Sequence, residues 1–121
     1  MSGKKNIIKD KSFSFALRII KLYNYLNQTK KEFVLSKQVL RSGTAVGALV
    51  REAQNAESKN DFIHKLAIAQ KECDETIYWL ELLVKSNFIS SKEFDSINEE
   101  ALSLLKMIRS AILTTKAKNK S

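Results

Sequence analysis

The chain contains no proline and only three glycines in 121 residues, and this scarcity of turn-forming residues is its most restrictive feature. A sheet of many short strands needs frequent turns, and glycine and proline supply much of that turn chemistry. The chain is rich instead in leucine, isoleucine, alanine, lysine and glutamate, which do not. The sequence therefore predicts an all-α protein, and its length fits a single domain that spans residues 1–121.

Apolar residues recur at helical spacing in four segments. We expect these helices at residues 11–27, 30–56, 59–86 and 91–115. Three starts carry a capping motif, in which a hydroxyl and a carboxylate three residues apart satisfy unpaired backbone donors. The motifs are Thr29-x-x-Glu32, Ser90-x-x-Glu93 and, more weakly, Ser58-x-x-Asp61. Short connections make neighbours antiparallel, so we expect an up-down-up-down four-helix bundle between short basic tails.

Three of the expected helices carry one clear apolar stripe each, with alternating steps of four and three residues. The stripes are Leu35, Val39, Ser42, Val46, Leu49, Ala53 and Ala56; Phe62, Leu66, Ala69, Cys73, Thr76, Leu80 and Leu83; and Phe94, Ile97, Ala101, Leu104, Ile108 and Ala111. Other apolar residues lie off these lines, and the first helix has two competing runs, Phe13/Leu17/Ile20 and Ala16/Ile19/Tyr23/Leu26. A second apolar surface favours a homo-oligomer over a monomer.

Two glycines, Gly43 and Gly47, interrupt the second helix four residues apart. Each costs roughly 1 kcal/mol relative to alanine in a helix interior, which predicts that something packs closely there. Two interpretations remain open: a close contact within the bundle, or a contact between subunits. The residues assigned to one or the other are Leu40, Gly43, Gly47, Val50, Ile68, Trp79 and Leu82.

Positive charge is concentrated at the two ends of the chain, whose formal net charge is +8. Residues 1–31 hold eight Lys/Arg against one acid, residues 32–100 hold eight against twelve, and residues 101–121 hold five against none. In an up-down bundle the first and fourth helices are neighbours, so their basic ends meet. This pattern predicts binding of RNA or DNA through phosphates, and its alternative is a solvated lysine face. The candidate contacts are Lys11, Arg18, Lys21, Lys106, Arg109, Lys116 and Lys118.

No set of residues indicates catalysis, a metal or a cofactor. His64 is the only histidine and pairs with Asp61 in a single D-x-x-H, which is short of a di-iron site. Cys73 lies on a core stripe and is expected to be a small buried hydrophobe. Glu52 is expected to pair structurally rather than to catalyse. We therefore expect no enzyme activity, no catalytic residues and no cofactor.

Location follows from three features of the sequence. A single cysteine forms no intrachain disulfide, and no apolar run of signal-peptide type follows the basic start. The most apolar segment, residues 77–84, is far short of the ~20 residues that cross a bilayer. We expect a cytoplasmic protein that has no membrane partner.

Two long segments, DKSFSFALRIIKLYNYL and RSGTAVGALVREAQNAESKNDFIHKLAIAQKECDETIYWLELL, closely resemble the bacterial 23S rRNA intervening-sequence proteins, roughly over residues 7–113. The most specific parts are Arg41-Ser42-Gly43-Thr44, Glu52-Ala53, Asp61-Phe62 and Tyr78-Trp79-Leu80-Glu81. The resemblance implies an antiparallel four-helix bundle that assembles into a ring-like homopentamer, with no established enzymatic activity. That family is also similar to the accessory proteins of diversity-generating retroelements, which act with a reverse transcriptase and nucleic acid.

Two functions remain in view. The favoured one is a non-enzymatic oligomeric scaffold that binds nucleic acid, with a reverse transcriptase among the protein partners that the resemblance implies. The alternative is a protein-interaction ring whose charge serves solubility.

Overall fold

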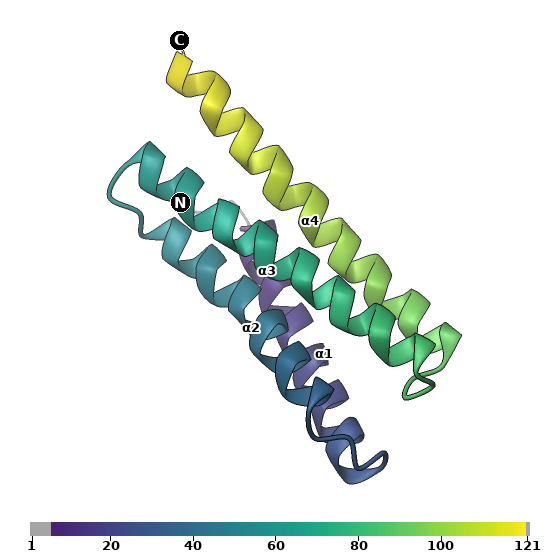
Figure 1. Ribbon diagram of the computed structural model, residues 1–121. Helices are drawn as coiled ribbons and strands as arrows, with labels where there is room; N and C mark the ends of the chain where they lie inside the picture. The colour runs from purple at the N-terminus through teal and green to yellow at the C-terminus, as the bar shows by residue number, and fades with distance from the viewer. Residues whose placement is uncertain (1–5, 121) are drawn as a thin grey trace.

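Four antiparallel helices make up the bundle in the computed structural model, which describes residues 6–120 and the side chains of residues 6–118. They are α1 (Ile7–Gln28), α2 (Leu35–Gln54), α3 (Lys59–Lys85) and α4 (Ser91–Lys120). Figure 1 shows the up-down-up-down order, with the end of α4 running on beyond the neighbouring helices. The predicted all-α four-helix bundle is confirmed. No helix in the described part of the chain is both long and apolar enough to span a membrane.

The helices do not pack equally. α2 packs closely against α1 and α3, and α3 packs closely against α4, whereas α1 and α4 make the fewest contacts of any adjacent pair. The seam between α1 and α4 is therefore the most open side of the bundle, and it holds two surface hollows.

The first connection differs from the prediction, because α2 begins at Leu35 and not at residue 30. Thr29 ends α1, and its backbone N–H donates to the carbonyl oxygen of Tyr25 at 2.9 Å. The chain then passes through Lys31, whose φ is 55°. The Glu32 carboxylate accepts from the backbone N–H groups at the start of α2, those of Val34, Leu35 and Ser36 at 3.2, 3.0 and 2.7 Å. Thr29 therefore ends α1 while Glu32 caps the start of α2, and the predicted capping box is wrong.

The other helix starts follow the sequence signals. The hydroxyl of Ser58 accepts from the backbone N–H of Asp61, and that of Ser90 from Glu93, both at 3.0 Å. α1 starts at Ile7, four residues before the predicted start, because the Asn6 side chain caps it. α4 continues to Lys120, so the segment predicted to be a basic tail after residue 115 is helical.

The core follows the predicted stripes most closely on α3, where all of the stripe from Leu66 to Leu83 is buried. On α2, Ser36 and Val50 are buried, and the predicted Leu35 and Leu49 are only half-buried. On α1 the buried line is Ser12, Phe15, Ile19, Leu22 and Leu26. The apolar run Phe13/Leu17/Ile20 is exposed on the outside of the bundle.

The two glycines of α2 allow α1 to approach closely. A Cβ at Gly43 would lie 2.7 Å from Cγ1 of Ile19, and a Cβ at Gly47 would lie 3.2 Å from the carbonyl oxygen of Ser12. Gly43 and Val50 are buried, so neither offers a surface to a second subunit. The contact at these glycines lies within the bundle.

Candidate functional surfaces

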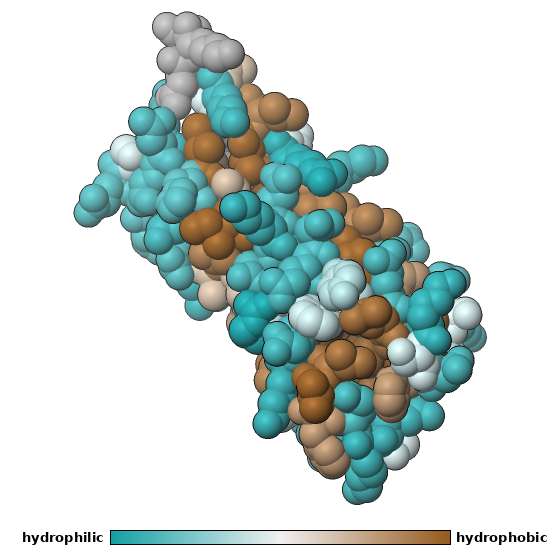
Figure 2. All heavy atoms as spheres, viewed as in Figure 1, coloured by the Kyte–Doolittle hydropathy of each residue, from teal (hydrophilic) through white to brown (hydrophobic). Residues whose placement is uncertain are grey.

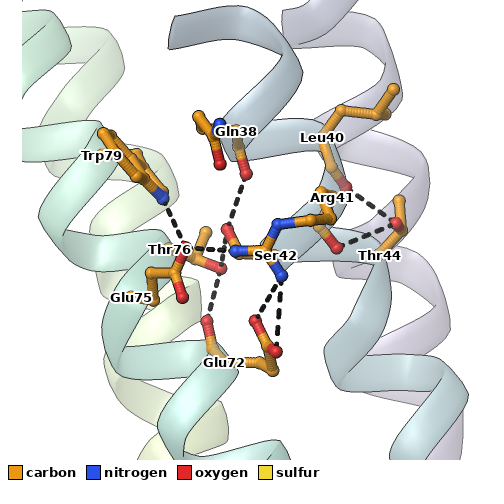
Figure 3. Close-up of polar contacts among 9 residues, drawn as sticks. All are labelled: Gln38, Leu40, Arg41, Ser42, Thr44, Glu72, Glu75, Thr76 and Trp79. Atoms are coloured by element: carbon orange, nitrogen blue, oxygen red, sulfur yellow. Dashed lines mark hydrogen bonds and ion pairs between the residues drawn. The ribbon is translucent and has the colours of Figure 1, made fainter.

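A buried pair of hydroxyls joins α2 to α3 at the centre of the bundle (Figure 3). The oxygens of Ser42 and Thr76 lie 2.9 Å apart, and both side chains are buried. The carbonyl oxygen of Gln38 is 3.1 Å from the Ser42 hydroxyl, and that of Glu72 is 2.8 Å from the Thr76 hydroxyl. The two hydroxyl protons can form two of these three hydrogen bonds at any one time. Both hydroxyls therefore have hydrogen-bond partners, and neither is activated for chemistry.

Arg41 sits directly outside that pair and clamps α2 to α3 (Figure 3). One guanidinium nitrogen lies 3.1 Å from Glu72, the other pairs with Glu75, and Nε1 of Trp79 donates to Glu75 at 2.9 Å. The hydrogen bond from Trp79, assisted by Arg41, lowers the pKa of the Glu75 carboxyl although partial burial opposes it. With its one cation opposed by two carboxylates, the cluster binds the two helices and presents no surplus positive charge.

The other candidates for a catalytic or metal-binding role do not form such a site. Glu52 pairs with Lys65 of α3 at 3.1 Å, which agrees with the expected structural role. His64 is exposed. Among the residues that the structure describes, no three His, Cys, Asp or Glu side chains gather as a metal site.

Cys73 lies in the core, where its Sγ contacts the carbonyl oxygen of Ala101 at 3.3 Å. Burial raises the pKa of the thiol to about 12, so the thiolate is scarce at neutral pH. We expect a thiol-specific disulfide reagent to leave the native protein unmodified and to label it at once in denaturant. Absorbance of the released thiolate measures this, and rapid labelling of the native protein would contradict the assignment.

One of the α1 residues that were predicted to contact phosphate, Arg18, already pairs with carboxylates of α4. The Arg18 guanidinium pairs with Glu100, lies 3.1 Å from Glu93 and donates to the Ser96 hydroxyl at 2.9 Å. Desolvation works against the charged form, but the hydrogen bonds with Glu100 and Glu93 raise the pKa of Arg18. Arg18 therefore holds α4 against α1, and its charge is already balanced. Neither carboxylate was predicted as a partner of Arg18, although their seven-residue spacing on α4 was the available signal.

Lys11 and Lys21 are exposed on α1, one in each hollow of the α1–α4 seam. The hollow beside Lys11 is also lined by Glu99 and Glu100, which cancel its positive charge. Positive and negative side chains alternate along the α1–α4 seam, so the candidate cations of α1 and α4 do not form one continuous patch.

The last half of α4 is different, because no acid follows Glu100. Lys106, Arg109, Lys116 and Lys118 are all exposed along this segment. Leu113, which is 67% exposed, lies among them. Lys106, Arg109, Leu113 and Lys116 are spaced by three, four and three residues, which places them along one face of the helix. We call these four residues the α4 basic face.

An apolar groove of about 700 Å³ runs between α1 and α2. It is lined by Phe13, Leu17 and Ile20, which are 53%, 48% and 41% exposed, and also by Gly47 and Ala48. Arg51 lies over the Phe13 ring, 5.9 Å from its centroid. We call this the α1–α2 groove. Exposed apolar residues in one line at such a groove are typical of a protein interface.

The residues of α3 that were predicted to form an interface do not line the α1–α2 groove. Ile68, Trp79 and Leu82 are half-buried, as Leu40 of α2 is, and Leu40 and Trp79 pack against the core. The Trp79 ring also meets that of Tyr78 edge-on, with centroids 5.1 Å apart. Figure 2 shows the face on which α2 and α3 run side by side as a hydrophilic surface interrupted by separate apolar groups. Among the described residues of α1 and α2, the large apolar side chains that are exposed along one line are Phe13, Leu17 and Ile20, which line the α1–α2 groove.

Comparison with known proteins gives two findings. Residues 4–110 match the sequence model of the 23S rRNA-intervening sequence protein family. The fold is similar to the 1.70 Å crystal structure of a protein with unknown function from the S23 ribosomal protein family, from Bacteroides thetaiotaomicron. That similarity has a TM-score of 0.88 at 51% sequence identity and covers 88% of this chain and 96% of the other. A comparison with curated proteins found no match.

Proposed function

Because the chain belongs to the 23S rRNA-intervening sequence protein family, we propose that it is a non-enzymatic, oligomeric scaffold that binds RNA or DNA through phosphates. The observation that carries this proposal is the α4 basic face, in a segment that has four exposed cations and no acid after Glu100. Exposed lysine and arginine side chains attract a polyanion of any sequence.

The binding surface that we propose is narrower than the sequence pattern alone implies. Arg18 is neutralised by Glu93 and Glu100, and Lys11 lies beside Glu99, so the α1 side contributes less than α4. Lys106, Arg109 and Lys116 extend over about 15 Å at 1.5 Å per residue, which spans several phosphates of a single strand.

We expect the double variant Lys106→Glu/Arg109→Glu to weaken binding of RNA and DNA alike, because it replaces two phosphate contacts with two repulsive charges. The matched control is Lys59→Glu/Lys92→Glu, which makes the same change of charge at exposed lysines of α3 and α4 that are not part of the α4 basic face. Fluorescence anisotropy with a labelled oligonucleotide at low salt measures both. Equal losses from the two variants would mean that only total charge matters.

Assembly is the second part of the proposal. The α1–α2 groove leaves three large apolar side chains about half-exposed, which burial against another copy would stabilise by roughly 25 cal/mol per Å² of apolar area. We propose that it is a contact between subunits of a homo-oligomer, with a pentamer as the expected number. A ring would repeat the α4 basic face and multiply weak phosphate contacts into avidity.

A protein-interaction scaffold without a nucleic-acid role is the second candidate. The same groove favours it, since a different protein could fill an apolar surface of this kind. Failure to bind either nucleic acid at low salt, by a sample of confirmed assembly, would favour this candidate over the first.

A further inference from the structure

A hollow of about 440 Å³ lies on the α1–α4 seam beside the α3–α4 connection. Leu22, Ile89 and Ile97 line it and are only 7%, 6% and 1% exposed, so they form its floor. Tyr25 stands at its edge and is 42% exposed. The hollow thus combines an apolar floor with an accessible aromatic ring.

Charged and polar groups surround this floor. Arg18 and Glu93 both line the hollow, and their ion pair at 3.1 Å, together with the pair to Glu100, balances the guanidinium. Lys21 also lines it and is exposed to solvent. Ser90 adds a hydroxyl, which accepts from the backbone N–H of Glu93 at 3.0 Å and still has a proton to donate. The hollow therefore offers a cation and a hydrogen-bond donor around an apolar centre.

We propose that this hollow receives one unstacked base of a single-stranded nucleic acid, with Tyr25 against the base and Lys21 near its phosphate. The inference rests on the proposed nucleic-acid function and names the kind of strand that is bound. A base has an apolar π-face and a polar edge, and proteins bind single strands by setting bases against aromatic rings. A base that is paired and stacked inside a duplex cannot enter such a hollow.

Two other hollows on the described part of the chain do not suit this ligand. The hollow beside Lys11 carries Glu99 and Glu100. The α1–α2 groove is larger and more apolar, but its lining holds three carboxylates, which offset its three cations; these residues are Glu52, Glu57, Asp61, Lys9, Arg51 and Lys65. Carboxylates at those positions repel the phosphates on either side of a base, whereas the one carboxylate among the residues that line the hollow at Tyr25 is Glu93, which pairs with Arg18.

The test compares Tyr25→Leu with Tyr25→Phe in anisotropy titrations of a labelled single-stranded oligoribonucleotide and a fully paired RNA duplex of equal length. We expect Tyr25→Leu to weaken single-strand binding about tenfold, the size of one lost stacking contact, and to leave duplex binding unchanged. Tyr25→Phe keeps the ring and should bind as the native protein does. Tyr78→Leu is the matched control, because Tyr78 is an exposed tyrosine on α3 outside the hollow.

The outcomes separate this inference from the proposed function. Salt-dependent RNA binding that Tyr25→Leu leaves unchanged, or weakens equally for single strand and duplex, would overturn the base site and leave the α4 basic face standing. The same loss from Tyr78→Leu would also overturn it. Absence of binding to both RNAs would overturn the proposed function and this inference together.

Discussion

Replacing Gly47 with leucine is expected to lower the free energy of unfolding by ~1–3 kcal/mol, the usual cost of forcing extra atoms into a packed interface. The Cβ alone would lie 3.2 Å from the Ser12 carbonyl oxygen and 3.4 Å from its carbon, both backbone atoms of α1. Backbone yields less readily than a side chain, so α1 must move away from α2. The loss should appear even though leucine favours a helix by nearly 1 kcal/mol over glycine.

Ala117→Leu is the matched control, because it adds a similar bulk at an exposed helical position of α4, outside the α1–α2 groove. Urea unfolding followed by circular dichroism measures both variants at one fixed protein concentration, since assembly makes stability depend on concentration. Equal stability of Gly47→Leu and the native protein would show that α1 and α2 do not meet as closely as described.

Leu17→Glu is expected to break the proposed assembly into single chains of 13.8 kDa. Leu17 is 48% exposed and lines the α1–α2 groove, so the folded chain tolerates a charge there. At an interface the same charge would be buried without a partner, which costs several kcal/mol and favours dissociation. We therefore expect the mass of the assembly in solution to fall to that of one chain, while the helix content stays the same.

Leu102→Glu provides the comparison, because Leu102 is 49% exposed on α4 and does not line the groove. Light scattering at micromolar concentration should show the native mass for Leu102→Glu and the single-chain mass for Leu17→Glu. A single-chain mass for the native protein would rule out the oligomer. Dissociation of the Leu102→Glu variant but not of the Leu17→Glu variant would show that the interface lies on α4.

The sequence predicted the fold well because its main signals are local. The α3 stripe from Leu66 to Leu83 repeats at helical spacing, and Ser58 and Ser90 cap their helices through residues three positions on. The α1–α2 connection shows the limit of such signals. Thr29 and Glu32 have the right types and spacing for a capping box, but the left-handed residue Lys31 separates them, so that Thr29 ends α1 and Glu32 caps α2.

The sites were harder to predict because they depend on how the helices are rotated against one another. The spacing of cations on α1 indicated a basic surface, yet only the packed bundle shows Arg18 beside Glu93 and Glu100. In the same way, periodicity left both apolar runs of α1 open. The close approach at Gly43 and Gly47 selects the line of Ile19 and Ser12 for the core and leaves Phe13 and Leu17 outside.

The central claim is that exposed cations of α4 bind phosphates, and the salt dependence of binding tests it most directly. The measurement is fluorescence anisotropy of a labelled single-stranded RNA across a salt series, with a sample of known assembly. Engagement of Lys106, Arg109 and Lys116 predicts a slope of log affinity against log salt of about −2 or steeper, at roughly −0.7 per phosphate. Lys106→Glu/Arg109→Glu should flatten that slope. A slope near zero, or no binding at low salt, would contradict the account.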